Sequence, residues 1–215
     1  MTALVLAGGS LHVTPRLRAA VAGARPVIAA DGGLRHARPL GVTPDLLVGD
    51  LDSVAAADRA AWPGLAVEAF PTDKEALDLE LALDAARARG ASRTLVVGAF
   101  GGRLDQSLAA AQIAARRAED GADLALLDGV QDVHPVAAGG SLALALPAGT
   151  TFSLLAGGDA ARVRVRGARY PLDDATLPRG VGRGVSNVAT GGGTRVDVSA
   201  GVVLVIVAYD GASVG

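Results

Sequence analysis

Short apolar runs alternate with segments of helical character along the first part of the chain, up to about Leu127. The runs have the length and composition of buried strands, and they read ALVLA, PVIAA, DLLVG, LAVEAF, TLVVGA and DLALL. The predicted helices between them lie near residues 14–22, 54–61, 74–89 and 104–119. This alternation predicts an α/β domain in which a mostly parallel sheet carries helices on both faces.

The helical periodicity disappears after about Gln131. Further strand-like runs follow, separated by Gly, Pro and Asp turns, and they read SLALAL, TFSLLA, ARVRVRG, TRVDVS and VVLVIVA. They predict an antiparallel β-sandwich or a partial jelly roll. We place the boundary between Asp128 and Gly140 and predict two domains, residues 1–130 and residues 131–215.

Acidic residues and glycines follow three of the predicted strands in the first domain. They are Asp31, Gly32 and Gly33, then Asp50 and Asp52, then Gly101, Gly102, Arg103 and Asp105. Ligands of a doubly wound sheet bind beyond the carboxyl ends of its strands, so we expect these residues to gather at one edge. A further acid, Asp78, is predicted one turn into the helix that starts near Lys74.

Each of these features also has a purely structural explanation. Asp52 or Ser53 could cap a helix that begins around Val54, because Asp and Ser are common caps and turn formers. Lys74 and Asp78 stand four residues apart, which suits an ordinary ion pair on one helical face. The functional explanation therefore depends on whether the carboxylates come together.

Clustered carboxylates repel one another unless cations lie between them. Hard oxygen ligands suit Mg²⁺, which completes its shell with water and substrate phosphates. Glycines let backbone N–H groups approach anionic oxygens, and Lys74 and Arg103 can neutralise phosphate charge. This combination indicates metal-assisted phosphoryl or pyrophosphoryl transfer. The chain has no GxxxxGK[ST] loop, and Gly8 and Gly9 do not complete a GxGxxG fingerprint.

Composition narrows the possible classes of protein. The chain has 215 residues, half of them apolar, with a net charge of −2 and 3% aromatic residues, so no nucleic-acid partner is indicated. The absence of cysteine excludes disulfides, thiolate metal sites and cysteine nucleophiles. The longest apolar stretch, AGVVLVIVAY, is too short for a membrane helix, and MTALVLAGGS does not resemble a leader. We therefore expect a cytoplasmic location and no membrane partner.

Several motifs, in their order along the chain, resemble those of the thiamine pyrophosphokinase family. Those of the first domain are DGG at Asp31, PDLLVGDLDS at 44–53, PTDKEALD at 71–78 and GAFGGRLDQ at 98–106. Those of the second are RYPLDDATL at 169–177, GVSN at 184–187 and a terminal β-hairpin ending GVVLVIV. Any one motif is weak, but the ordered set is specific and spans nearly the whole chain.

The resemblance implies an α/β domain joined to a β-sandwich, working as a homodimer. Members of the family transfer pyrophosphate from ATP to the hydroxyethyl oxygen of thiamine, with Mg²⁺ as cofactor, and release AMP. Their sites lie between the α/β domain of one subunit and the sandwich of the other. ATP and thiamine are thus the expected small-molecule partners.

The resemblance also implies a role for each matching residue. Asp50, Asp52 and Asp78 would bind Mg²⁺, with Asp31 as a further ligand or directly behind the ligands. The ATP phosphates would be held by Lys74, Arg103, Gly101 and Gly102. Asp105 would face the acceptor hydroxyl, and the thiamine pocket would include Gln106 and, across the dimer, Ser186 and Asn187.

Two positions depart from the family pattern. Gln106 stands where the family usually has His, and Ala110 stands where it usually has Asn. Gln cannot take up a proton, so the acceptor could be another hydroxyalkyl heterocycle, such as a pterin. A third possibility is a nucleotide-binding regulatory protein without turnover. The three histidines, His12, His36 and His134, lie outside the motifs and are predicted at the surface or in turns.

Overall fold

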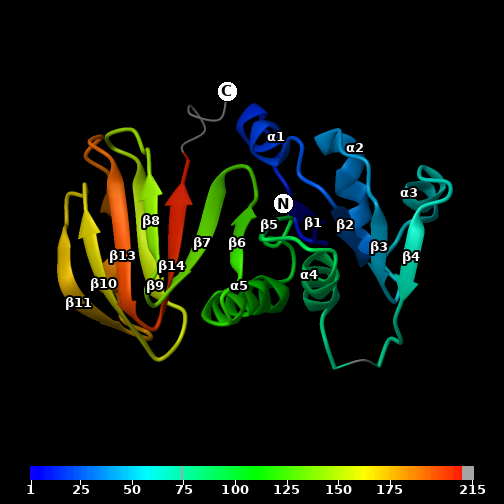
Figure 1. Ribbon diagram of the computed structural model, residues 1–215. Coiled ribbons are helices and arrows are strands. Elements are labelled where there is room, and N and C mark those ends of the chain that lie inside the picture. Colours follow the sequence, from blue (N-terminus) through cyan, green and yellow to red (C-terminus); the bar gives the residue numbers. More distant parts are fainter. Residues whose placement is uncertain (74, 210–215) are drawn as a thin grey trace. The chain divides into compact units, whose positions relative to one another are not determined.

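The computed structural model describes residues 1–73 and 75–209, which form two compact units (Figure 1). Among the described residues, unit 1 comprises Met1–Ala110 and Leu126–Gly129, and unit 2 comprises Ala111–Ala125 and Val130–Tyr209. The division into domains of residues 1–130 and 131–215 stays a prediction. No helix within the described residues has the length and apolar character needed to span a membrane.

Five parallel strands form the sheet of unit 1, in the order β5-β1-β2-β3-β4. They are β1 (Thr2–Leu6), β2 (Val27–Ala30), β3 (Leu46–Gly49), β4 (Ala66–Ala69) and β5 (Arg93–Val97). The chain runs outward from β1 to β4 and then returns to the other side of β1. The carboxyl ends of β1 and β5 therefore meet at the switch point where such sheets bind ligands.

Helices cover both faces of this sheet, as the sequence pattern predicted. Figure 1 shows α1 and α2 on one side of the strands and α4 on the other. The helical segments of unit 1 are α1 (Pro15–Val21), the 3-10 helix η1 (Asp31–His36), α2 (Ala37–Leu40), α3 (Ala56–Ala60) and α4 (Asp78–Ala88). Cover on both faces explains why β2 and β3 are buried along their whole length and have no polar alternation. The sequence pattern did not predict η1 and α2.

Helix α4 begins later than predicted. Its first residue is Asp78, and the backbone N–H of Leu77 donates to Glu80 Oε2 at 3.1 Å, which closes the helix N-terminus. The predicted start near residue 74 is wrong, and Asp78 opens the helix instead of lying one turn inside it. The predicted pairing of Lys74 with Asp78 involves a residue outside the described ranges. A carboxylate in the first turn is stabilised by the helix dipole.

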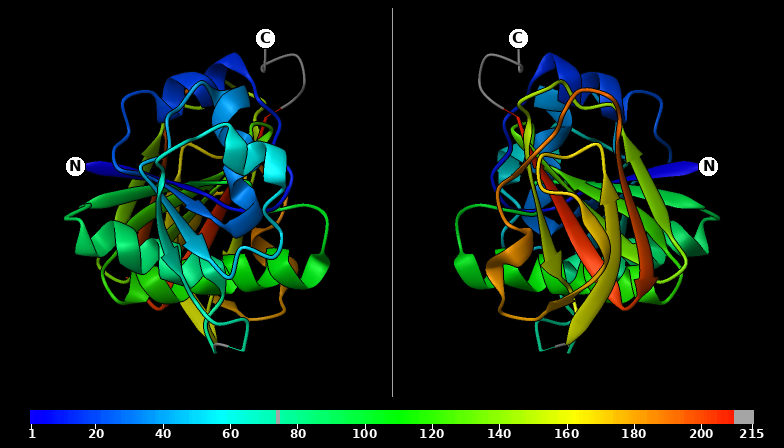
Figure 2. Two further views of the ribbon diagram at one scale, coloured as in Figure 1. Left: turned by 90° about the vertical axis from the view of Figure 1, so that its right-hand side faces the viewer. Right: turned by 90° about the vertical axis from the view of Figure 1, so that its left-hand side faces the viewer.

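Two antiparallel sheets form a sandwich in unit 2, and the right-hand view of Figure 2 shows its strands in green to red. The strand orders are β12-β9-β14-β7 and β11-β10-β13-β8. The strands are β7 (Gln131–Ala137), β8 (Ser141–Leu144), β9 (Thr151–Ala156), β10 (Ala160–Arg166), β11 (Leu172–Pro178), β12 (Asn187–Val188), β13 (Thr194–Ala200) and β14 (Val202–Ala208). The shared core includes Phe152, Val163, Val196 and Val205, so the predicted sandwich is confirmed.

Two elements cross the division between the units: helix α5 (Leu104–Glu119) and strand β6 (Asp123–Leu127). Unit 2 also contains a short 3-10 helix, η2 (Gly182–Gly184). Strands β7, β11 and β12 were not predicted as strands from the sequence.

The expected terminal β-hairpin is not formed. Strand β13 pairs with β10 and β8, whereas β14 pairs with β9 and β7, so the two consecutive strands belong to opposite sheets. A single residue, Gly201, connects them with φ +68°. A Cβ added at Gly201 would overlap the carbonyl oxygen of Ala160, so the crossing between the sheets requires glycine.

Replacing Gly201 with alanine should therefore destabilise unit 2 beyond the ordinary cost of a left-handed residue. Gly139 is a matched control, because it has φ +82° and open space at the Cβ position. We expect Gly139→Ala to cost about 1–2 kcal/mol and Gly201→Ala to cost about 1–3 kcal/mol more because of overpacking. Urea denaturation followed by circular dichroism measures both. Equal losses would contradict the proposed close contact.

Candidate functional site

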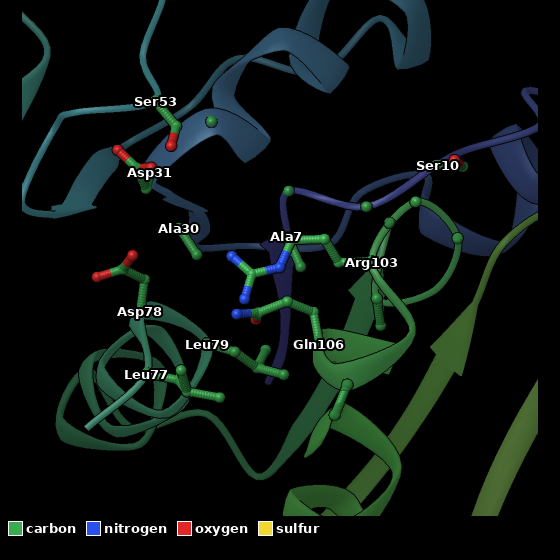
Figure 3. A pocket seen from close by; sticks show the side chains of 18 of the residues that line it. Ala7, Ser10, Ala30, Asp31, Ser53, Leu77, Asp78, Leu79, Arg103 and Gln106 are labelled. Atoms are coloured by element: carbon green, nitrogen blue, oxygen red, sulfur yellow. The ribbon is translucent and has the colours of Figure 1, made fainter. Parts of the chain in front are cut away.

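A pocket of about 440 Å³ opens in unit 1 at the carboxyl ends of β1, β2 and β5 (Figure 3). This volume suits a small-molecule ligand. Its lining includes Gly8, Gly9, Ser10, Asp31, Gly32, Arg35, Ser53, Asp78, Gly98, Gly101, Gly102, Arg103, Gln106 and Ala110. The three strand-end segments that were expected at one sheet edge each contribute to this lining, and Asp78 joins them.

Three carboxylates come together at this edge. One oxygen from each of Asp31, Asp50 and Asp78 lies within 4.8 Å of the others. Asp31 follows β2, Asp50 follows β3, and Asp78 opens α4. Figure 3 shows the carboxyl groups of Asp31 and Asp78 on the same side of the pocket. Asp31 is buried and the other two are half-buried, so water screens the cluster only in part.

The backbone leaves space for this cluster at Gly49. This glycine has φ +141°, and an added Cβ would lie 3.0 Å from Cβ of Asp31 and 3.1 Å from Oδ1 of Asp78. Asp31 itself adopts φ +45°, a left-handed conformation that costs a non-glycine residue free energy. The local chain therefore tolerates strain where the carboxylates meet.

The cluster fits a hard divalent cation. No described residue offers a hydrogen-bond donor to Oδ1 of Asp31, although this oxygen is buried. A buried acceptor without a donor is unfavourable and rare in native proteins. Carboxylate oxygens are the ligands that Mg²⁺ prefers, and a bound ion would satisfy this oxygen.

Asp52 lies outside the three-carboxylate cluster. Its side chain is exposed, its Oδ1 accepts a hydrogen bond from Ser53 Oγ at 2.8 Å, and its backbone N–H donates to Asp50 Oδ1 at 3.3 Å. Helix α3 begins at Ala56 without a side-chain cap, so the capping explanation for Asp52 and Ser53 is wrong. A metal-binding role for Asp52 stays a prediction, and Asp31 is the third member of the observed cluster.

Arg103 and Asp105 form an ion pair at the start of α5. Arg103 Nε lies 3.1 Å from Asp105 Oδ1, and its terminal nitrogen lies 2.5 Å from Oδ2. The hydrogen bonds from Arg103 lower the pKa of Asp105, and Asp105 in turn raises the pKa of Arg103. Figure 3 shows the Arg103 side chain reaching into the pocket beside Gln106. Arg103 therefore faces the pocket with its charge compensated by Asp105.

Sequence reasoning missed two residues of η1 beside the pocket. Arg35 lines it, and His36 is buried, so the surface or turn position predicted for His36 is wrong. The Nε2 nitrogen of His36 lies 2.9 Å from the carbonyl oxygen of Gly9 and must carry the hydrogen, because a carbonyl only accepts. The one available signal was their position directly after the DGG motif, at the carboxyl end of a strand.

The remaining predicted residues fall into three groups. Gln106 and Ala110 line the pocket from one face of α5. Ser186 and Asn187 belong to unit 2, where the Asn187 side chain bonds to the backbone of Tyr170 and Val188. Lys74 lies outside the described residues. Of the predicted acids, Asp31 and Asp78 line the pocket, together with Gly101, Gly102 and Arg103, whereas Asp50, Asp52 and Asp105 are not part of its lining.

Comparisons with known proteins agree on one family. A family model described as "Thiamin pyrophosphokinase, catalytic domain" matches residues 17–126, and one described as "Thiamin pyrophosphokinase, vitamin B1 binding domain" matches residues 142–203. No curated protein sequence matches the chain significantly.

Solved structures with a similar fold include thiamin pyrophosphokinases from bacteria and fungi. The Bacillus subtilis enzyme has a TM-score of 0.85 at 23% identity, covering 98% of this chain and 100% of its own. The Geobacillus thermodenitrificans enzyme has a TM-score of 0.82 at 24% identity, covering 99% and 100%. The Candida albicans enzyme has a TM-score of 0.78 at 14% identity, covering 96% and 90%. These likenesses extend along nearly the whole fold.

The environment of His36 predicts a pH-dependent stability. Burial lowers the pKa of His36 below its usual 6.5, and Arg35 adds to this effect. The unfolded chain then binds more protons than the folded chain just below pH 6.5, so stability falls on acidification. His36→Gln keeps a donor for Gly9 and removes this contribution. Urea midpoints at neutral and mildly acidic pH should differ less for His36→Gln than for wild type.

His12→Gln is the matched control, because His12 is exposed. Its urea midpoints at the two pH values should differ as much as those of the wild type. Each variant differs from wild type at one histidine, so the comparison isolates the contribution of that histidine. An unchanged acid-induced loss in His36→Gln would contradict the assignment of a buried, neutral imidazole.

Proposed function

This chain belongs to the thiamin pyrophosphokinase family, and from that premise we propose how the pocket of unit 1 transfers pyrophosphate from ATP to thiamine. The enzyme converts ATP and thiamine into AMP and thiamine diphosphate. The family assignment decides in favour of the thiamine enzyme among the three functions that the sequence left open. The observation that carries the local proposal is the cluster of Asp31, Asp50 and Asp78, of which Asp31 and Asp78 line the pocket together with Arg103.

The three clustered carboxylates would hold Mg²⁺. The buried Oδ1 of Asp31, which has no donor among the described residues, supports this role, and Gly49 keeps the space between the acids open. When bound, the ion neutralises phosphate oxygens and polarises the phosphorus that is attacked. Asp52 would be a further ligand only if its side chain turned from Ser53, and its role remains a proposal.

In the reaction, the hydroxyethyl oxygen of thiamine bonds to the β-phosphorus of ATP. The bond from that phosphorus to the oxygen bridging the α-phosphate breaks, and AMP leaves with the electron pair. Arg103 and Lys74 would bind phosphate oxygens. Phosphoryl transfer through a loose transition state depends mainly on position and charge neutralisation, so Gln106 in place of a histidine is compatible with turnover.

Asp105 would orient the hydroxyl of thiamine. It accepts hydrogen bonds from Arg103 in this structure, and its lowered pKa makes it a weak base. Orientation requires Arg103 to turn toward the phosphates when ATP binds, which frees the Asp105 carboxylate for the acceptor. The hydroxyl proton then passes to water.

The family resemblance also supports a homodimer in the cytoplasm. Ser186 and Asn187 of a second copy would contribute to thiamine binding. The Asn187 side chain already bonds to Tyr170 and Val188, so its contribution would be to hold the loop that presents Ser186. Ser186 is exposed and adopts φ +58°, a conformation that Gly and Asn adopt more readily.

The direct test is incubation of the protein with ATP, Mg²⁺ and thiamine, followed by chromatography of the products. We expect AMP and thiamine diphosphate in equal amounts. Formation of ADP and thiamine monophosphate would mean transfer of a single phosphoryl group and would exclude the proposed reaction.

Asp31→Asn tests the metal cluster, because Asn tolerates the left-handed backbone at this position. We expect kcat/KM to fall by at least about a hundredfold, or about 2.7 kcal/mol of barrier. Stability without metal should be unchanged or higher, since repulsion within the cluster is relieved. Asp159→Asn, exposed in unit 2, is the control and should keep full activity.

Asp52→Asn is the informative comparison in the same assay. Because Asp52 lies outside the cluster, its replacement should cost less activity than that of Asp31. Equal losses would place Asp52 among the ligands. Full activity of Asp31→Asn, combined with lower stability, would contradict the metal assignment.

Asp105→Asn separates two roles of this carboxylate. If Asp105 orients the acceptor, the variant should lower kcat more than it weakens ATP binding, because ATP is held by Arg103, Lys74 and the metal. If Asp105 acts only by holding Arg103, ATP affinity and kcat should fall together. Steady-state kinetics and calorimetry with ATP alone provide the two measurements.

A further inference from the structure

Arg35 carries a positive charge at the pocket and has no role in the transfer steps proposed above. Its guanidinium donates to the carbonyl oxygens of Gly32 and Gly9 at 2.9 Å each, and also to that of Gly8. All three acceptors are uncharged. Among the described residues, no carboxylate forms an ion pair with Arg35, although its side chain is exposed at the pocket wall.

Arg103, the other arginine of the pocket lining, is in a different state. Both oxygens of Asp105 bond to it, so its charge is already compensated. Arg35 therefore supplies the uncompensated positive charge of the described lining. An anionic ligand entering this pocket gains more binding free energy from Arg35 than from Arg103, because Arg103 must first break its hydrogen bonds to Asp105.

Three backbone N–H groups of the surrounding loops already have acceptors. Gly9 N–H donates to the Gly98 carbonyl and Ser10 N–H to the Phe100 carbonyl, each at 2.6 Å. Gly101 N–H donates to Ser107 Oγ at 3.1 Å. Because these groups are engaged, they cannot surround a phosphate as a glycine-rich loop does. An anion beside these loops therefore needs donors other than these three groups, and side-chain cations can supply them.

Arg35 also lies on the same short helix as Asp31. Both residues line the pocket, and η1 contains six residues, Asp31–His36. A polyphosphate held by a cation at Asp31 would therefore lie in the pocket whose wall carries Arg35. The planar guanidinium can donate to two phosphate oxygens at once, and hydrogen bonds to anionic oxygens are stronger than those to neutral carbonyls.

We infer that Arg35 is a nucleotide-binding residue whose guanidinium exchanges the Gly8 and Gly9 carbonyls for phosphate oxygens of ATP. In the free protein the carbonyls hold the side chain in place, and the incoming polyphosphate replaces them. This inference rests on the proposed function, because it names a contact of the same substrate in the same pocket.

Calorimetry with thiamine omitted tests this contact without turnover. The ligands are ATP, inorganic tripolyphosphate and adenosine, each with Mg²⁺. Arg35→Gln keeps an amide that can donate to carbonyls but removes the charge, and Arg35→Lys keeps the charge. Arg38→Met is the matched control, because Arg38 is exposed nearby on α2 but does not line the pocket.

We expect Arg35→Gln to weaken the binding of ATP and tripolyphosphate by at least about tenfold, about 1.4 kcal/mol, and to leave the binding of adenosine unchanged. Arg35→Lys should bind ATP more tightly than Arg35→Gln, and Arg38→Met should match wild type. Should Arg35→Gln fail to fold, Arg35→Met takes its place as the uncharged variant.

Two results would overturn the inference: unchanged ATP affinity in the uncharged variant, or parallel losses for ATP and adenosine. Parallel losses would mean that Arg35 only holds the loops together. The product assay on wild type keeps this outcome separate from the proposed function. If the wild type makes thiamine diphosphate but the Arg35 variant binds ATP with normal affinity, the proposed function stands and only the role of Arg35 is refuted.

Discussion

Repulsion among Asp31, Asp50 and Asp78 is the constraint on which the site in unit 1 depends. Two like charges about 4 Å apart repel by about 4 kcal/mol at an effective dielectric constant near 20. The fold holds them together because Ala30 pairs with Val48 in neighbouring parallel strands, which brings the two following acids to one edge. The backbone that resists this repulsion in the free protein is thereby preorganised for a cation.

The remaining wall of the pocket is held by hydrogen bonds between loops. The loop after β1 donates to the loop after β5 through Gly9 and Ser10, and it accepts from His36 and Arg35 on η1. These bonds connect three strand ends that are distant in sequence. A pocket with such connections is largely formed before its ligand arrives, so less binding free energy is used to order it.

Much of this arrangement could be predicted from the sequence, because strands and strand-end acids have local signals. Apolar runs identified the strands of the parallel sheet, and the rule that ligands bind at carboxyl ends brought Asp31 and Asp50 together. Asp78 was assigned to the metal site by the family resemblance. Arg35 and His36 had only their position after the DGG motif as a signal, since their roles depend on the backbone of another loop. The crossing between the sheets at Gly201 could not be predicted either, because alternating apolar and polar residues identify a strand but not the sheet to which it belongs.

That connection affects how unit 2 is made. Strand β14 lies between β9 and β7, and its residues Val202–Ala208 pair with Ala137–Gln131 in reverse order. Pairing across such a sequence separation is slow, because a long loop must close first. During synthesis, the sheet cannot close until residue 208 has left the ribosome. A nascent chain stalled before that point exposes two unpaired strand edges, which are sites for aggregation and for chaperone binding.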